Sequence, residues 1–375
     1  MLSFWERESF LQYDIIIIGT GIVGLSTAIS LKEKFPKRDI LILERGLFPT
    51  GASTRNAGFA CFGSLTEVLY DLEHNGADRT LAVIEKRIHG LQLLRQRLGD
   101  EAMDYQHVGG YELLFDKEMP ALQHIVKANT LLQKHFPEAV YMEKPELVSK
   151  FGFNKNVVRT IVYNPHEGHV HTGKMMRALL RLTQEKGIQI LTGAEVTGME
   201  ENPSNVEIKV KESTRGTVNF KAQQVVVCAN AFTSLLLPDC KITPGRGQVI
   251  ITKPIQNLNW QGALHFDEGF YYFRNVGDRV LFGGGRNMAF EEETSTQFQY
   301  NENILAQLEN ILREVILPGK NFEIEQRWSG IMGFSEDKQP IVQQVSDRVI
   351  VGFSCNGMGV SLSSAIGYDV ADLMK

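Results

Sequence analysis

The sequence predicts an α/β fold, α+β overall, in which a parallel sheet with a β-meander forms one domain and an antiparallel sheet flanked by helices forms a second. An apolar run, a glycine-rich turn, a helix and another apolar run follow one another over residues 14–44, an order that requires a crossover and therefore a parallel sheet. Alternating segments at 193–200, 205–211 and 216–221 predict the meander. Mostly strand-like residues at 242–286 predict the antiparallel sheet.

The remaining elements follow from periodicity. Apolar positions at helical spacing predict a surface helix over 78–98. Reading from the N-terminus, we expect helices at 22–34, 120–135, 144–151, 173–186, 302–315 and 361–374, and strands at 14–18, 39–43, 111–115, 188–191, 224–228, 248–252, 270–274, 279–283 and 348–353.

Two domains that are discontinuous in sequence are predicted from the chain length and from the recurrence of alternating strands and helices after residue 170 and again near the C-terminus. The chain has 375 residues, of which 43% are hydrophobic and 22% charged, an ordinary composition for a globular protein of about two domains. We expect the first domain to comprise 1–75, 155–240 and 325–375, and the second 76–154 and 241–324.

Charge and cysteine usage exclude several classes of partner. The formal charge is −5, from 39 Lys+Arg and 44 Asp+Glu, and without a basic run a nucleic-acid partner is not expected. Cys61, Cys228, Cys240 and Cys355 form no CxxC pair, which argues against a zinc site or a disulfide framework. The start of the chain lacks a signal-peptide pattern, and no apolar stretch approaches the roughly 20 residues of a transmembrane helix. We expect a cytoplasmic protein.

The first glycine-rich turn has the spacing of a dinucleotide-binding loop. In GxGxxG at 19–24, Gly19 permits the turn, Gly21 lets a pyrophosphate approach the backbone, and Gly24 lets helix and strand pack closely. Ile22 and Val23 begin the helix whose amino end would hold the phosphate. We therefore predict a Rossmann-like domain.

A carboxylate completes this pattern. Glu44 lies 20 residues after Gly24, at the end of the next strand, where it can accept hydrogen bonds from ribose hydroxyls. This position argues against a 2′-phosphorylated cofactor. The alternative is a fortuitous glycine turn with a solvated glutamate. FAD and NAD share the ADP half, so the pattern alone does not separate them.

Two further segments favour FAD. The small, polar loop GASTRNAGFA at 51–60 follows the ribose position directly and can wrap a cofactor closely. Near the C-terminus, the segment 352–360 again places a glycine turn between a strand and a helix. The positive end of that helix, facing the flavin N1 and C2 carbonyl, would stabilise the anionic reduced ring. The alternative for this second loop is simple helix capping.

At this point the chain resembles the superfamily of D-amino-acid oxidase, glycine oxidase, sarcosine oxidases and γ-glutamylputrescine oxidase. The resemblance spans nearly the whole chain, and GASTRNAG is most similar to the γ-glutamylputrescine oxidase branch. It rests on the order and spacing of DIIIIGTGIVGLSTA at 14–28, ILILERG at 40–46, GASTRNAG at 51–58, GHVHTGKMMRAL at 168–179, VVVCANAFTSLLLP at 225–238, RGQVI at 246–250 and GMGV at 357–360.

The resemblance implies FAD bound in extended form and carries over a set of contacts. The pyrophosphate would lie at the first glycine loop and at Ser53 and Thr54, the ribose at Glu44, and the adenine near Val196 and Ala229. The isoalloxazine would lie along residues 56–58. The implied cofactor residues are Gly19, Gly21, Ile22, Val23, Gly24, Glu44, Arg45, Ser53, Thr54, Asn56, Ala57, Gly58, Val196, Ala229, Gly330, Gly357, Met358, Gly359 and Val360.

The implied reaction transfers a hydride from the carbon beside an amine nitrogen to flavin N5, after which water hydrolyses the imine and oxygen reoxidises the flavin. No acid–base residue is strictly required for this reaction. Alternatives are a flavin dehydrogenase that passes electrons to a quinone or carrier protein, and a catalytically degenerate FAD-binding protein. An NAD-dependent dehydrogenase would not explain residues 51–60 or the second glycine loop.

The chain departs from the family at the substrate anchors. Family members place an arginine just after Trp-x-Gly or before the C-terminal glycine turn, where this chain has Met332 and Cys355. We therefore expect an amine or amino-acid derivative rather than a free α-amino acid. Phe62, Tyr272, Met332 and Cys355 are the expected pocket residues.

Three residues are candidates for catalysis or for replacing the lost anchors. Tyr272 and Arg274 share one face of a strand, where Tyr272 could orient a substrate nitrogen or carboxylate, although plain core packing is the alternative. Arg274 and Arg286 are candidate carboxylate anchors. The string HEGHVH at 166–171 is not HExxH, and no metal is expected.

Overall fold

A parallel sheet forms the centre of one half of the molecule. The computed structural model describes residues 2–212, 216–353 and 355–375. Strand β1 (Gln12–Ile18) lies between β2 (Ile40–Leu43) and β11 (Gly216–Val227), and β8 (Gln189–Leu191) and β18 (Val349–Phe353) extend the sheet in parallel. Strand β17 (Ile341–Gln344) is the antiparallel edge. Residues 15–18 are all buried, as expected for a strand that is covered on both faces.

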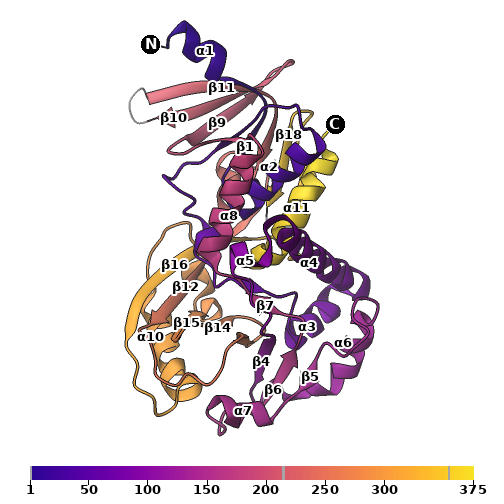
Figure 1. Ribbon diagram of the computed structural model, residues 1–375, viewed down its shortest axis with the longest axis vertical. Helices are drawn as coiled ribbons and strands as arrows, with labels where there is room; N and C mark the ends of the chain where they lie inside the picture. Colours follow the sequence, from indigo (N-terminus) through magenta and orange to yellow (C-terminus); the bar gives the residue numbers. More distant parts are fainter. Residues whose placement is uncertain (1, 213–215, 354) are drawn as a thin grey trace.

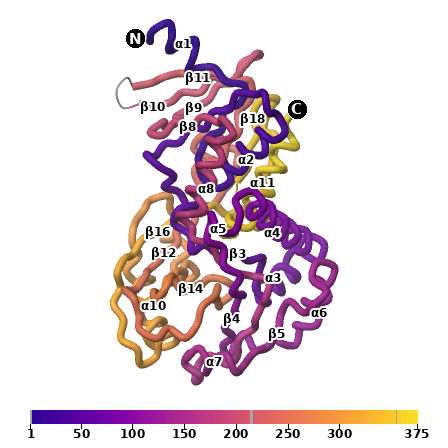
Figure 2. Tube along the Cα trace, viewed as in Figure 1, coloured from indigo at the N-terminus to yellow at the C-terminus, as the bar shows by residue number. Residues whose placement is uncertain are grey.

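Helices cover this sheet and pack on one another. The covering helices are α2 (Ile22–Lys34), α8 (Thr172–Glu185) and α11 (Gly359–Leu373), and α4 (Ala77–Leu98) packs on α11. Figure 2 shows the N-terminal α2 in indigo beside the C-terminal α11 in yellow. A Cβ at Gly367 of α11 would lie 2.6 Å from backbone atoms of Ser26 and Thr27 in α2. Glycine therefore allows the two helices to approach closely.

The meander is confirmed, with one correction. Strands β9 (Glu195–Glu201) and β10 (Val206–Glu212) pair antiparallel with β11. The prediction of separate strands at 216–221 and 224–228 is wrong, because β11 runs through without a turn. Its first part pairs with β10, and its second part lies between β1 and β18. The burial pattern records this change, since alternation gives way to the fully buried Val225, Val226 and Val227.

A largely antiparallel sheet forms the other half of the molecule, as predicted. Its order is β16 (Ile324–Phe334), β12 (Thr243–Thr252), β15 (Arg279–Gly284), β14 (Tyr271–Val276), β13 (Ala263–Phe266), β4 (Gly110–Leu114), β6 (Thr160–Asn164) and β5 (Met142–Glu143). The pair β13–β4 is parallel. Figure 1 shows this sheet in the lower part of the molecule, with α10 on one side and α3 and α6 on the other.

The helices of this half are α3 (Leu65–Asn75), α6 (Ile125–Leu132), α7 (Glu146–Phe151) and α10 (Glu302–Ile311), which continues as a π-helical turn over Leu312–Ile316. The helix predicted at 120–135 begins instead as a 3₁₀ segment, Met119–His124. Helices α1 (Phe4–Phe10) and α3 were not predicted. The short elements are α5 (Asp100–Met103), α9 (Phe290–Glu293), β3 (Phe59–Ala60), β7 (Gly168–His169) and the 3₁₀ segments Ala52–Thr54, Asn230–Leu235 and Arg286–Met288.

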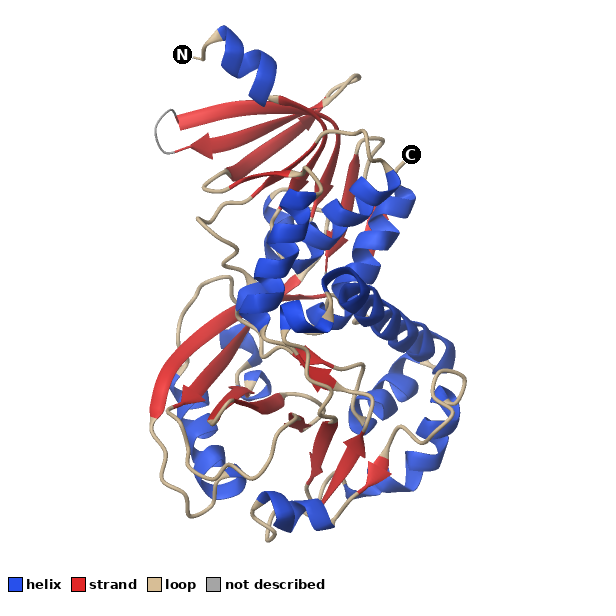
Figure 3. Cartoon of the chain, viewed as in Figure 1, coloured by secondary structure: helices blue, strands red, loops and turns tan. Residues whose placement is uncertain are grey.

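The division into two domains stays a prediction, and sheet membership does not follow it everywhere. Strands β6 and β16 belong to residues expected in the first domain, yet both pair in the second sheet. Figure 3 shows β16 as the long strand beside β12. Among the residues that the structure describes, no helix is long and apolar enough to cross a membrane.

We expect the substitution Gly367→Ala to destabilise the fold by about 1–3 kcal/mol, because the new methyl group overlaps the backbone of α2 and can be accommodated only if a helix moves. Part of this loss is offset by the better helix propensity of alanine. Chemical denaturation measures the change. Gly198→Ala is the control, since its Cβ would meet nothing closer than 4.0 Å. Equal stabilities of the two variants would contradict the close-packing interpretation.

Candidate functional site

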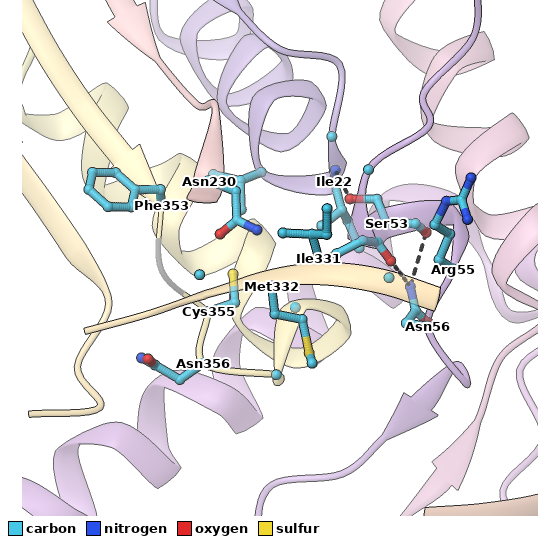
Figure 4. A pocket seen from close by; sticks show the side chains of 18 of the residues that line it. Ile22, Ser53, Arg55, Asn56, Asn230, Ile331, Met332, Phe353, Cys355 and Asn356 are labelled. Carbon is cyan, nitrogen blue, oxygen red and sulfur yellow. Dashed lines mark hydrogen bonds between the residues drawn. The ribbon is translucent and has the colours of Figure 1, made fainter. Parts of the chain in front are cut away.

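A cavity of about 480 Å³ is lined by residues from both sheets and from the two glycine-rich loops. The turn after β1, the end of β2, the loop at 49–59 and the loop at 352–360 contribute from the first half. Strands β12, β14 and β16 contribute from the second. Figure 4 shows part of this lining, with Ser53 and Asn56 on one side and Cys355 and Asn356 on the other.

The first glycine loop forms an open cradle at the amino end of α2. Gly19 has a φ of +105°, and a Cβ at Gly24 would lie 1.9 Å from the carbonyl oxygen of Gly19. Gly21 caps the helix without a side-chain hydrogen bond, and the Ile22 amide donates to the Ser53 hydroxyl at 2.8 Å. The remaining first-turn amides and the helix dipole favour an anion at this point.

Glu44 is held rigidly where β2 ends. Its side chain is buried, and one carboxylate oxygen accepts from the Thr20 amide at 3.0 Å and the Thr20 hydroxyl at 2.5 Å. The other oxygen accepts from the Gly46 amide at 2.8 Å. These bonds hold an acceptor at the cavity wall. Nearby, the guanidinium of Arg45 lies 3.8 Å from the centre of the Phe232 ring, and both residues line the cavity.

The loop at 51–58 is fixed by the side chain of Asn56. Its amide nitrogen donates to the carbonyls of Ala52 at 3.1 Å and Ser53 at 3.0 Å. Its oxygen accepts from the Gly58 amide at 2.8 Å and from the hydroxyl of Thr172 at 3.0 Å. The loop is therefore a preformed wall.

The second glycine loop faces the same cavity. Gly357 has a φ of +88°, and a Cβ there would meet nothing within 4 Å. Helix α11 begins at Gly359 without a side-chain cap, and the Met358 amide donates to the Cys355 carbonyl at 2.8 Å. Burial raises the pKa of the Cys355 thiol to about 12. The thiol is thus neutral, and the positive end of α11 is a polar feature of this wall.

Tyr272 and Met332 converge on the opposite wall. A Cβ at Gly283 would lie 2.7 Å from ring atoms and the hydroxyl of Tyr272, so the ring lies over that glycine. A Cβ at Gly247 would lie 3.2 Å from the Met332 methyl and 3.7 Å from the Tyr272 hydroxyl. Burial raises the pKa of Tyr272 to about 12, which keeps the phenol a neutral donor.

The two candidate anchors differ in position. Arg286 lines the cavity, where its guanidinium lies 4.0 Å from the ring centre of Phe334, and no carboxylate of the described residues forms an ion pair with it. Burial lowers the pKa of Arg286. Arg274 lies outside the lining and donates to the Val170 carbonyl at 2.8 Å. Burial lowers the pKa of Arg274 to about 10.

The structure brings most of the predicted site residues to one cavity. All the predicted cofactor residues line it except Gly24, which packs under the first loop, and Thr54, whose hydroxyl donates to the Pro49 carbonyl at 2.9 Å. Of the predicted pocket residues, Phe62 is not in the lining and stacks on Phe136 at 5.3 Å. Their contacts with a cofactor or substrate stay predictions.

Sequence reasoning missed several polar residues of the lining. They come from α3, α4, β13, the turn between β13 and β14, and the loop before β17, where no local motif marks them. The missed residues are Glu67, Tyr70, Asp71, Arg87, His265, Glu268 and Lys338. Within the described part of the chain, no cluster of three His, Cys, Asp or Glu residues could hold a metal ion.

Comparisons of the sequence with known proteins identify relatives that are redox enzymes. The profile of one family, described as FAD dependent oxidoreductase, matches residues 14–373. Human mitochondrial L-2-hydroxyglutarate dehydrogenase is 26% identical over 317 residues, covering 77% of this chain and 64% of the relative. Gamma-glutamylputrescine oxidoreductase of Escherichia coli K12 is 20% identical over 379 residues, covering 96% and 83%.

Among solved structures, L-proline dehydrogenase from P. horikoshii has a TM-score of 0.79 with 19% sequence identity, covering 97% of this chain and 94% of that chain. At this identity the likeness supports the fold. It agrees with the predicted combination of a parallel and an antiparallel sheet.

We expect Glu44→Gln to weaken FAD binding by about 10- to 100-fold, because the carboxamide keeps only one acceptor oxygen, which the Thr20 and Gly46 amides also need, and so loses charge-assisted hydrogen bonds to the ribose hydroxyls worth about 1.5–3 kcal/mol. Titration of the apoprotein with FAD, followed by flavin fluorescence, measures the affinity. Glu195→Gln is the matched control, an exposed carboxylate that also lines the cavity. A Glu44 variant with unchanged affinity would show that this carboxylate does not hold the cofactor.

Proposed function

This chain belongs to the family of FAD-dependent oxidoreductases, and we propose that it oxidises a C–N bond in an amine or amino-acid derivative. The match over residues 14–373 confirms the superfamily, the cofactor and the enzyme class predicted from the motifs. The observation that carries the substrate proposal is the wall around Tyr272, Met332 and Cys355, which has no cation where the family motifs place arginine.

The chemistry of the lining fits FAD. In this proposal the amino end of α2, with Ser53, holds the pyrophosphate, and Glu44 holds the ribose. The loop at 56–58 and the loop at 355–359, which both line the cavity, would hold the flavin ring. Bound FAD supplies a hydride acceptor at N5.

The chain's own task is to orient the substrate and to keep water away. Tyr272 offers a neutral hydroxyl to a substrate nitrogen or acid oxygen, since burial keeps its pKa at about 12. Met332 and the neutral Cys355 give an apolar surface on which an amine-bearing carbon can lie. Excluding water strengthens each polar contact inside the site.

We assign Arg286 the role of binding an acid group on the substrate. Its guanidinium lies on the cavity wall over the Phe334 ring and forms no ion pair with the described residues, whereas Arg274 already donates to a backbone carbonyl. A planar guanidinium binds a carboxylate through two parallel hydrogen bonds. We therefore favour an amine whose acid group lies away from the reacting carbon.

We propose oxygen as the electron acceptor, with a quinone or a carrier protein as the alternative. Oxygen consumption compared with dye reduction under the same substrate separates the two. If oxygen is the acceptor, hydrogen peroxide forms in step with substrate loss. Dye reduction without peroxide would favour the alternative.

The substrate proposal is tested by anaerobic bleaching of the bound flavin with three classes of compound. The amines are putrescine, N-acetylputrescine and the secondary amine N-methylglycine, the amino acids with a primary amino group are glycine and D-alanine, and the hydroxy acid is L-2-hydroxyglutarate. We expect the amines to reduce the flavin at least about tenfold faster than these two amino acids, because binding energy that a missing arginine would supply is worth about that factor. Fastest reduction by glycine, D-alanine or L-2-hydroxyglutarate would contradict the proposal.

We expect Arg286→Met to raise KM for N-methylglycine by about tenfold or more and to change KM for putrescine less than about threefold, because only the first carries a carboxylate for the guanidinium. Initial rates measure both values. Arg177→Met, on the exposed face of α8 and outside the cavity, is the control. Equal changes for both amines would exclude a specific contact with the acid group.

A further inference from the structure

A row of three titratable side chains crosses the second sheet and ends in the main cavity. Glu112 of β4 is the direct strand partner of His265 in β13, and His265 is the partner of Tyr272 in β14. Directly paired residues on neighbouring strands point to the same face of the sheet. A carboxyl group, an imidazole and a phenol therefore lie next to one another on one face.

His265 separates two cavities. It lines the main cavity together with Tyr272, and it also lines a small cavity of about 10 Å³. Polar residues surround the small cavity, among them Glu112, Asn164 and Glu167. Its volume is close to what one buried water molecule requires.

Unpaired polar atoms surround that small cavity. The Nε2 atom of His265 and the side-chain nitrogen of Asn164 are both buried without a hydrogen-bond partner among the described residues. Leaving such groups unpaired costs about 1–3 kcal/mol each. A water molecule between them and the two carboxyl groups would satisfy both.

The two carboxyl groups of the small cavity have pKa values near neutral pH. Glu112 is 2% exposed and Glu167 is 1% exposed. Glu112 accepts from the hydroxyl of Thr66, and Glu167 accepts from the Phe62 amide at 3.1 Å. Burial raises the pKa of Glu112 to about 7 and that of Glu167 to about 8.

Charged groups on the neighbouring helices reinforce this tendency. Glu67 of α3 raises the pKa of both buried carboxyl groups, and Glu112 further raises that of Glu167. Burial raises the pKa of Tyr141, and Arg87 of α4 lowers it only in part. The Tyr141 hydroxyl donates to the Gly63 carbonyl at 2.7 Å. Tyr141 therefore stays protonated.

The imidazole of His265 is neutral at physiological pH. Burial lowers its pKa, and the nearby Glu67 opposes that shift only in part. A neutral imidazole can accept a proton at one ring nitrogen and release another from the second. Transfer from His265 towards Glu112 is downhill, because the pKa of the carboxyl group is the higher of the two.

We propose that His265 and Glu112, joined by a water molecule in the small cavity, form a relay that removes the proton which a substrate ammonium group must lose before its C–H bond is oxidised. An N–H bond of the ammonium breaks and an N–H bond forms on one ring nitrogen of His265. The other ring nitrogen gives its proton to the water, which passes one to the Glu112 carboxylate. No electrons move in these steps.

This relay rests on the proposed oxidation of amines and gives the site a proton acceptor that no sequence motif marked. His265 is the group that meets the substrate. Glu112 is a positioning and accepting residue behind it. The proton returns to solvent through the main cavity after the product leaves.

The test is the pH dependence of anaerobic flavin reduction by putrescine and N-methylglycine in the FAD-loaded enzyme. We expect His265→Gln to reduce the limiting rate about 100-fold near pH 7, a usual contribution of a general base. The deficit should shrink to about threefold or less near pH 10, where a large fraction of the amine arrives already neutral. His89→Gln, an exposed histidine on α4, is the control and should match the wild type at both pH values.

A deficit of equal size at both pH values, or none at all, would overturn the relay. Glu112→Gln should give the same pH pattern as His265→Gln, and Glu112→Asp, which keeps a carboxyl group, should recover most of the rate near pH 7. The flavin absorbance of the purified protein shows whether His265→Gln retains FAD. If it does not, the two Glu112 variants test the relay.

A second arm needs no substrate and so separates failure of the relay from failure of the proposed function. NMR of the FAD-loaded protein with ¹³C-labelled glutamate should show a buried carboxyl group titrating near pH 7. Glu112→Gln should remove that signal, and His265→Gln should shift its midpoint. Absence of any carboxyl titration near neutral pH would overturn the relay even if putrescine bleaches the flavin.

Discussion

The contact between Gly24 and the carbonyl oxygen of Gly19 is the constraint on which the rest of the site depends. A side chain at position 24 would lie 1.9 Å from that oxygen, so only glycine lets α2 start directly above the end of β1. Helix α11 then packs on α2 through Gly367. This packing places the second glycine loop opposite the first, and the cavity lies between elements fixed by these two backbone approaches.

Local sequence patterns predicted the elements that carry the cofactor loops, because those patterns arise from contacts between near neighbours. The helix expected at 22–34 matches α2, and the glycine spacing at 19–24 predicted the open helix end. Helices α1 and α3 were missed although Ser3 with Glu6 and Ser64 with Glu67 form capping boxes, which are readable signals of a helix start.

Positions that depend on long-range packing could not be predicted in the same way. Tyr272 and Arg274 lie two residues apart on β14 and therefore share one face. Arg274 nevertheless donates to the carbonyl of Val170, which is distant in sequence. His265 and Glu112 are far apart in sequence and become neighbours only through the parallel pair β13–β4. The continuity of β11 likewise depends on partners from three different strands.

Burial disfavours the charged forms of three groups on the cavity wall, Tyr272, Cys355 and Arg286. Tyr272 and Cys355 are held neutral, and Arg286 is a cation of the wall for which the described residues provide no ion pair. Such a lining suits a substrate that brings its own acid group and loses its ammonium proton before reaction. Membership of the family accounts for FAD and its chemistry. Met332 and Cys355, which stand where family members have arginine, determine which side chains would face the flavin ring.

The most direct test of these conclusions is a crystal structure of the protein loaded with FAD. We predict the pyrophosphate at the amino end of α2 beside Ser53, the ribose at Glu44, and the isoalloxazine between residues 56–58 and the loop at 355–359, with Tyr272 and Met332 on its open side. A flavin ring placed away from Tyr272 and Met332, or a pyrophosphate that does not meet the α2 amino end, would contradict this arrangement.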